Sequence, residues 1–264
     1  MKLSIVIPAH NEEGCIESTV RALATELKKE SIEFELLVVN DNSTDKTGEI
    51  IEKLAEEIAE LRALKNSPPH GFGFAVRQGL KSFTGDAVAI YMADASDSPK
   101  DLVRFYREMK SENVECVFGT RWDKKSEVVD YPWFKLVLNR LINHFIQCLF
   151  GIRYNDVTNA FKLYSRRTIK GVEPIISPHF NLTVELPLKA IVRGFSYSVV
   201  PNSWINRKSG ESKLKIKEMG SRYLFIILYC FIEKWLSRGD YHCDNMVRQE
   251  KFPIKKAGIT HQID

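Results

Sequence analysis

The 264-residue sequence predicts an α/β protein whose mostly parallel mixed sheet is flanked by helices, on the strength of three observations. Its apolar content of 44% is ordinary for a chain that buries a full core, which excludes disordered and fibrous proteins. Short β-branched runs alternate with stretches whose apolar residues recur at helical spacing. Acidic and amide residues follow several of the predicted strands, and ligands bind at the carboxyl ends of strands in such sheets.

The predicted elements of the first half are five buried strands and the helices between them. Strands are expected at residues 3–7, 34–39, 61–65, 87–92 and 114–118. Amphipathic helices are expected at residues 13–29, 46–60, 74–83 and 99–110. Together they give the βαβ pattern of a parallel sheet.

The second half begins with a long amphipathic helix, expected over residues 131–152, and continues with short strands at 161–164 and 197–201. An apolar run at 223–232 would be roughly 15 Å long as a helix, against a hydrocarbon core of about 30 Å, so it cannot span a membrane. We expect one domain over residues 1–239, with halves 1–122 and 123–239. The polar tail 240–264 lacks periodicity and is expected to be flexible.

Charge and cysteine usage exclude several kinds of protein. A formal charge of +4 is too small to indicate nucleic-acid binding. The five cysteines form no C-x-x-C pair, so neither a disulfide framework nor a zinc site is predicted, and a reducing compartment fits best. The first residues look like a strand and not like a signal peptide, so a cytoplasmic location is expected.

Polar residues follow the first two predicted strands. Asn11 and Glu12 come after the first, and Asn40 and Asp41 after the second. A carboxylate such as Asp41 at a strand end is suited to accept hydrogen bonds from a nucleobase or a ribose. The alternative is plain helix capping, with Asn11 or Ser43 as N-caps and neighbouring acidic residues favouring the helix starts.

Two further loops carry groups suited to a diphosphate. The segment 69–79 has two glycines, which let backbone approach a ligand, followed by Arg77, which can neutralise phosphate. The acidic loop 92–97 places Asp94 and Asp97 directly after a buried strand, where carboxylates are costly unless paired or bound to a metal such as Mg²⁺ or Mn²⁺. The alternative is that Asp97 or Ser98 caps the helix that starts at Pro99.

These motifs, in this order, resemble the family-2 glycosyltransferases of the GT-A fold. The later segments 119–121, 156–162 and 206–214 are similar to the dolichol and polyprenyl-phosphate mannose synthase group, and the resemblance covers about residues 1–236. One departure concerns the acidic loop, because the group usually has Asp-Ala-Asp-x-Gln before the proline. Here Ala93 and Ala95 stand where those aspartates belong, and Asp97 stands at the glutamine position.

The resemblance implies a role for each matching position, with residues 1–122 binding the nucleotide-sugar and 123–239 the acceptor. The donor site would comprise Pro8, Ala9, Asn11, Glu12, Asn40, Asp41, Arg77, Ala93 and Asp94. Phosphate and acceptor would meet Arg121, Asn139, Arg207, Ser212 and Lys213. Asp94 and Asp97 would hold Mg²⁺ or Mn²⁺ and carry the chemistry.

The implied reaction moves a hexose from a GDP-mannose or UDP-glucose type donor to a polyprenyl or dolichyl phosphate, with inversion. A phosphate acceptor needs no strong base, whereas a sugar hydroxyl would require one. Asp156 and Glu185 are the candidates for that base. The structural alternative is that they are buried carboxylates paired with Arg121 or Arg193.

A basic stretch at 207–222 beside the apolar run favours attachment to the cytoplasmic face of a membrane, directly or through a membrane-embedded subunit. The structural alternative is that both apolar helices, at 131–152 and over 223–232, pack on the sheet as core. Two other functions stay open: the same donor chemistry on a soluble saccharide or protein, and an inactive subunit that only binds a nucleotide-sugar.

Overall fold

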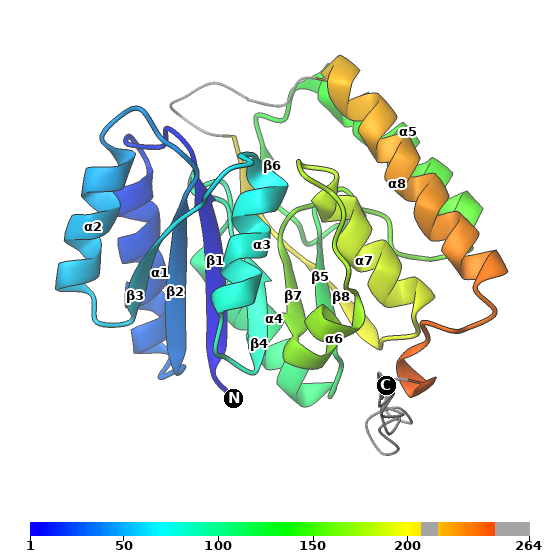
Figure 1. Cartoon of the computed structure of the whole chain (residues 1–264), viewed down its shortest axis with the longest axis horizontal. Helices are drawn as coiled ribbons and strands as arrows, with labels where there is room; N and C mark the ends of the chain where they lie inside the picture. The colour runs from blue at the N-terminus through cyan, green and yellow to red at the C-terminus, as the bar shows by residue number, and fades with distance from the viewer. Residues whose placement is uncertain (207–215, 246–264) are drawn as a thin grey trace, which may run out of the picture.

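A seven-stranded mixed sheet forms the centre of the computed structural model, which describes residues 1–206 and 216–245, without the side chains of 216–219 (Figure 1). The strand order is β3-β2-β1-β4-β7-β5-β8. Neighbouring strands are parallel except where β7 lies antiparallel to both β4 and β5. The predicted mostly parallel sheet is therefore confirmed.

The strands of this sheet are short, and two further strands pair with each other outside it. The main strands are β1 (Leu3–Ala9), β2 (Phe34–Asn40), β3 (Leu61–Lys65), β4 (Ala87–Ile90), β5 (Cys116–Thr120), β7 (Lys162–Ser165) and β8 (Tyr197–Pro201). The outer pair is β6 (Val128–Val129) and β9 (Trp204–Ile205). The helices are α1 (Ile16–Lys29), α2 (Thr47–Glu57), α3 (Phe72–Ser82), α4 (Pro99–Ser111), α5 (Trp133–Phe150), α6 (Arg166–Gly171), α7 (Leu182–Val192) and α8 (Ile216–Leu236).

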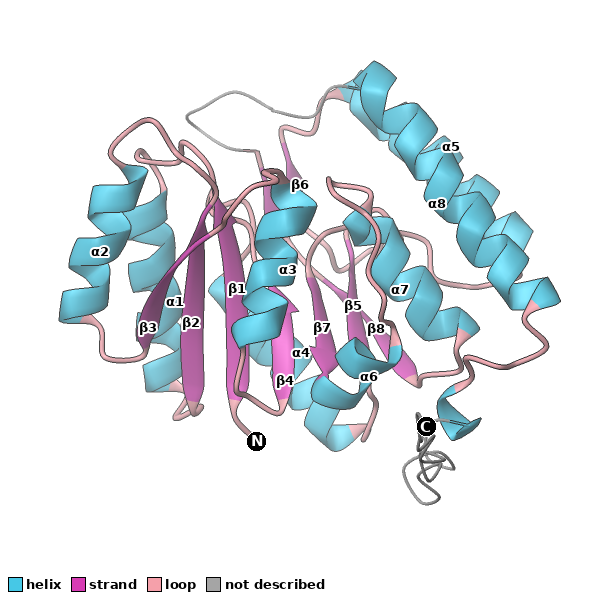
Figure 2. Cartoon of the chain, in the orientation of Figure 1, coloured by secondary structure: helices cyan, strands magenta, loops and turns pink. Residues whose placement is uncertain are grey.

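Helices cover both faces of the sheet, because successive strand residues point to opposite sides (Figure 2). Leu3, Ile5 and Ile7 of β1 pack with α1, α2 and α4, while Val6 packs with α3 on the other face. Helix α3 lies very close to β1, since a Cβ added at Gly79 would come 2.3 Å from Val6. This layering brings the carboxyl ends of β1, β2 and β4 to one edge of the sheet.

The elements of the first half match the predicted ones within a few residues, and β3 matches exactly in its bounds. The second half contains elements that the periodicity did not predict. Helices α6 and α7 were missed, as was the β6–β9 pair. Helix α7 is buried on nearly every side and contains Pro187, so it shows neither a clear apolar stripe nor an uninterrupted helical composition.

Helices α5 and α8 contact each other and lie beyond the sheet (Figures 1 and 2). The Phe150 and Phe231 rings are 6.0 Å apart, and Lys234 Nζ donates to the Phe150 carbonyl over 2.6 Å. Helix α8 packs on α7, and its Ile226 and Ile227 are buried there. Helix α5 contacts the rest of the protein through the buried Ile146 and through hydrogen bonds of Asn139. These two helices therefore form the outer layer of this half.

One face of α5 turns its apolar side chains outward, whereas Ile146 and Phe150 on another face are buried in the core, so the alternative in which this helix packs as core holds in part. Leu141 is 63% exposed, whereas the polar Asn143 is fully buried. The large apolar side chains that both helices expose are Trp133, Phe134, Val137, Leu141, Phe145, Leu224, Phe225, Leu228, Ile232, Trp235 and Leu236. Within residues 1–206 and 216–245, no helix is both long and apolar enough to cross a membrane.

Candidate functional site

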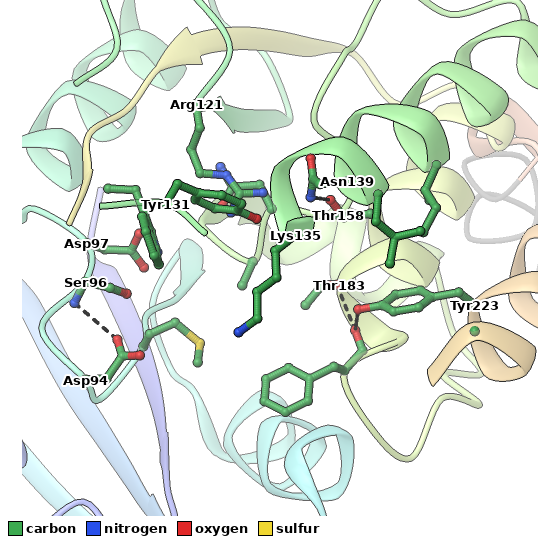
Figure 3. A pocket seen from close by; sticks show the side chains of 18 of the residues that line it. Asp94, Ser96, Asp97, Arg121, Tyr131, Lys135, Asn139, Thr158, Thr183 and Tyr223 are labelled. Atoms are coloured by element: carbon green, nitrogen blue, oxygen red, sulfur yellow. Dashed lines mark hydrogen bonds between the residues drawn. The ribbon is translucent and has the colours of Figure 1, made fainter. Parts of the chain in front are cut away.

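A cavity of about 380 Å³ opens where the carboxyl ends of the strands face α5, the start of α7 and α8 (Figure 3). One wall is the acidic loop with Asp94, Ser96 and Asp97. Lys135 and Asn139 of α5 lie in the opposite wall, beside an apolar region. The apolar region is formed by Leu138, Ile142, Phe180 and Tyr223. The cavity thus joins a charged end to an apolar one.

The acidic loop is held in place by contacts of its backbone. Asp94 Oδ1 accepts from the Ser96 amide over 3.1 Å, and Ala95 between them has a φ of 57°. The Tyr91 hydroxyl donates to the Asp97 carbonyl, and the Ser96 carbonyl accepts from the Ile205 amide of β9 over 3.1 Å. These contacts leave both carboxylates at the cavity, with Asp94 7% and Asp97 6% exposed.

Helix capping does not account for these residues. Helix α4 begins at Pro99, and the side chain of the preceding Ser98 makes no capping hydrogen bond. Asp97 lines the cavity instead of the helix start. Ser98 therefore stands at the N-cap position without a side-chain capping bond, and Asp97 is not the cap.

Burial and the neighbouring Asp94 carboxylate together raise the pKa of Asp97 to about 8, although Arg121 opposes the shift. Two buried carboxylates at one cavity are costly, and a divalent cation would relieve that cost. Mg²⁺ in particular is usually held by one or two carboxylates together with substrate phosphates and water. The donor set of this loop therefore fits such an ion, with Asp94 and Asp97 as the protein ligands.

The raised pKa of Asp97 predicts a pH-dependent affinity for metal. An unfolded chain ionises this group near 3.9, so the native state holds an extra proton between about pH 4 and 8, and its stability falls as pH rises through that window. A cation must displace the proton below pH 8. Calorimetric titration with Mn²⁺ should show an affinity that rises roughly tenfold per unit from pH 6 to 8 and then levels. Asp97→Asn should flatten this profile; a flat wild-type profile would contradict the expectation.

Asp156 is the partner of Arg121 in a buried ion pair. Arg121 Nε and one terminal nitrogen each donate to the carboxylate over 2.8 Å, and the Arg121 amide donates over 3.0 Å. Burial alone would lower the pKa of Arg121, but the Asp156 carboxylate outweighs it and raises that pKa. The guanidinium also lies over the Trp122 and Tyr131 rings. The structural alternative for Asp156 is confirmed, and its occupied carboxylate gives no geometric support to a general base.

Glu185 is likewise structural, but with another partner than predicted. It accepts from Lys189 Nζ over 2.6 Å, and from the Ile176 and Ser177 amides over 2.9 and 2.7 Å. Arg193, the expected partner, pairs with Glu233 instead. Glu185 is fully buried and does not line the cavity, so it has no access to a substrate bound there.

The loops after β1 and β2 are cross-linked by their side chains. The Asn11 amide donates to Ser43 Oγ over 3.1 Å, and the Thr44 amide donates to Asn11 Oδ1 over 2.8 Å. The capping alternative is wrong here, because α1 starts after Cys15 and α2 after Lys46. Asn40 Oδ1 accepts from the Ser43 amide over 3.0 Å. The two loops therefore form one rigid edge.

Asp41 binds the loop that precedes α3. Its carboxylate accepts from Asn66 Nδ2 over 2.7 Å and from the Gly71 amide over 2.8 Å, and His70 Nδ1 lies 3.1 Å away. Gly71 has a φ of 141°, a conformation that only glycine adopts readily. This brings the three loops expected to bind nucleotide together at one edge of the sheet.

The remaining residues predicted to bind the donor do not all line the cavity. Pro8 and Ala9 are buried at the end of β1, and Glu12 lines the cavity. The Ala93 carbonyl accepts from Thr19 Oγ1 over 3.0 Å. Arg77 donates to the Ile175 carbonyl over 2.8 Å and does not line the cavity. Arg207, Ser212 and Lys213 lie outside the described residues.

Lys135 is a charged cavity residue that the sequence did not single out. Its side chain extends from α5 into the cavity, across from Asp94 and Asp97 (Figure 3). Asn139, one turn later, accepts from Trp122 Nε1 over 3.1 Å and donates to Thr158 Oγ1 over 2.7 Å. The polar stripe formed by 135, 139 and 143 at i, i+4 spacing was the available signal, but only Asn139 of this stripe was expected to meet the acceptor.

Known proteins are similar to this chain in sequence over most of its length. The model of Glycosyl transferase family 2 matches residues 4–172. Glycosyltransferase AglD of Haloferax volcanii is 26% identical over 231 residues, which cover 85% of this chain and 36% of that protein. Polyprenol monophosphomannose synthase of Mycolicibacterium smegmatis is 26% identical over 216 residues, which cover 80% of each chain. The chain thus spans about a third of the length of the first relative and most of the second.

Among solved structures, glucosyl-3-phosphoglycerate synthase of Mycobacterium tuberculosis, in complex with Mn²⁺, UDP and phosphoglyceric acid, superposes with a TM-score of 0.67. The match covers 87% of this chain and 78% of that one, at 17% identity. A likeness at this level of identity establishes a shared fold.

Proposed function

The chain belongs to glycosyl transferase family 2 and has the GT-A fold, and from this premise we propose that it transfers a hexose from a nucleotide-sugar to a polyprenyl or dolichyl phosphate, with inversion. One observation carries the choice of acceptor. The cavity has an acidic pair on one wall and Lys135 on the other, and α5, which supplies Lys135, exposes apolar side chains such as Trp133 and Leu141 on its outer face. A phosphate with a long apolar tail fits both features.

The donor in this proposal is of the GDP-mannose or UDP-glucose type. Its nucleoside binds at the cross-linked loops after β1 and β2, with Asp41 and Asn11 at that edge. The diphosphate lies toward Ala93 and Asp94 at the end of β4. With the donor bound in this order, the sugar would lie in the cavity beside Asp97.

Asp94 and Asp97 would hold the divalent ion, whose charge would neutralise the diphosphate leaving group. The two side chains also orient that leaving group, because their backbone is fixed to β9 and to Tyr91. Charge stabilisation of this kind needs ligands that do not move during the reaction.

The displacement joins an acceptor phosphate oxygen to the anomeric carbon as the bond from that carbon to the diphosphate breaks, and the electron pair leaves with the diphosphate. Lys135 holds the acceptor phosphate by its charge, and Asn139 supports the wall from which Lys135 extends. A phosphate is ionised near neutral pH, so no protein base is needed. Positioning and charge neutralisation supply the catalysis.

The exposed apolar side chains of α5 and α8 would seat the protein on the cytoplasmic face of a membrane, alone or with a membrane-embedded subunit. Replacing both Trp133, 75% exposed, and Phe225, 61% exposed, by serine should weaken binding to vesicles about 100-fold. Vesicle sedimentation measures this. Val199→Ser, an exposed apolar position on β8, is the matched control and should bind as the wild type does. Unchanged binding of the double variant would contradict a membrane role.

The decisive test is transfer of a radiolabelled sugar from each nucleotide-sugar in the presence of a polyprenyl phosphate. Label in an organic-extractable product supports the proposal. Label that appears only in an aqueous product with a soluble saccharide or protein would replace it with the alternative acceptor. Nucleotide binding without any transfer would indicate an inactive binding subunit.

A further inference from the structure

A second cavity lies between the segment that precedes α7 and the first described turns of α8. It is lined by Ser177 and Asn181 on one side and by Arg222 and Phe225 on the other. None of these residues lines the catalytic cavity, which uses Phe180 and Tyr223 of the same two elements. The two cavities therefore lie on different sides of one wall.

Three side chains of this second cavity have donor groups without a protein acceptor among the described residues. Ser177 is 1% exposed, and its buried Oγ makes no hydrogen bond. Asn181 uses its Oδ1 to accept from the His179 amide over 3.2 Å, and its Nδ2 donates to no described residue. Arg222 forms no ion pair with any described carboxylate. A buried hydroxyl without a partner costs about 1–3 kcal/mol, so a ligand that accepts from it is expected.

The charge around this cavity favours an anion. A carboxylate next to the cavity is that of Glu185, which accepts from the Ser177 amide over 2.7 Å. It is neutralised by Lys189 at 2.6 Å. The charge that remains at this cavity is therefore the positive charge of the Arg222 guanidinium. A planar guanidinium binds phosphate oxygens especially well.

We propose that this cavity binds the phosphate of an anionic phospholipid headgroup, a second phosphate site apart from the acceptor site. The proposal rests on the membrane role in the proposed function. Phe225 lies one turn beyond Arg222 on α8 and is 61% exposed, and Leu224 and Leu228 beside it are exposed too. A lipid would place its headgroup at Arg222 and its chains along this apolar surface, which a free phosphate would not use.

The test uses monomeric dihexanoyl phosphatidylglycerol, below its micelle concentration, titrated into the whole protein by calorimetry. The wild type should bind it, and Arg222→Gln should weaken binding about tenfold or more. Arg238→Gln removes the same charge from an exposed position after α8 and should change nothing. Ser177→Ala should weaken lipid binding without lowering stability, since it removes a hydroxyl that has no partner.

Three results would overturn this site: no binding by the wild type, unchanged binding by both Arg222→Gln and Ser177→Ala, or inorganic phosphate binding as tightly as the lipid. The assay contains no sugar donor and no acceptor, so it is independent of transfer. Lipid binding without sugar transfer would contradict the proposed function alone, and transfer without lipid binding would contradict this site alone.

Discussion

Asp94→Asn is expected to lower the rate of sugar transfer about 1,000-fold, the size typical of removing one charge-stabilising group from an enzyme site. Asp94 is one of two carboxylates in the cavity, and an amide binds a divalent cation far less well than a carboxylate does. The fold should survive, because an asparagine Oδ1 can still accept from the Ser96 amide, and repulsion with Asp97 disappears. Initial rates at saturating donor, with and without Mn²⁺, measure the effect.

Asp123→Asn is the matched control, because Asp123 is an exposed carboxylate that does not line the cavity. Its rate should equal that of the wild type.

Asp94→Asn should also lower the pKa of Asp97, because it removes the neighbouring negative charge. The pH dependence of Mn²⁺ binding to this variant should therefore shift to lower pH. Undiminished Mn²⁺-dependent transfer by Asp94→Asn would remove the metal assignment.

Arg121→Met should destabilise the protein by about 3–5 kcal/mol, the usual cost when one partner of a buried ion pair is removed. Asp156 is fully buried, and Arg121 supplies three of its hydrogen bonds, one of them from its backbone. The variant leaves that carboxylate without its charge partner. Urea unfolding followed by circular dichroism gives the free energy of unfolding.

The double variant Arg121→Met with Asp156→Leu separates lost charge compensation from lost packing. It should recover most of the stability, because apolar replacements of a buried pair are often neutral. If the double variant were less stable than Arg121→Met alone, the packing of Arg121 against Trp122 and Tyr131 would explain the loss, and the ion-pair account would fail.

The sheet could be predicted from the sequence because buried parallel strands leave continuous β-branched runs, as in β1 and β2. The helices between them showed clear amphipathic periodicity. Helix α7 could not be predicted in the same way, since both of its faces are buried and no stripe remains. The β6–β9 pair has only two residues in each strand, too few for a pattern.

The edge of the sheet that carries the site was likewise predictable, because strand-end loops rich in Asp and Asn stand at fixed points in the βαβ order. The side chains that pair with the buried carboxylates could not be predicted from the sequence. Asp156 meets Arg121 across 35 residues, and Glu185 meets Lys189 within one helical turn. Which pairing forms depends on where the chain brings the charges together, and the residue types alone allow several.

The sequence by itself determined the family, the sheet and the acidic loop with Asp94 and Asp97, because these depend on local periodicity and on motifs of short spacing. Only the tertiary structure decided the orientation of α5. Its composition allows either face to be buried, and the cavity wall formed by Thr158 and Trp122 offers hydrogen bonds to Asn139 and Asn143. Satisfying those buried polar groups turns Leu141 and Phe145 outward, which creates the apolar surface on which the proposed function depends.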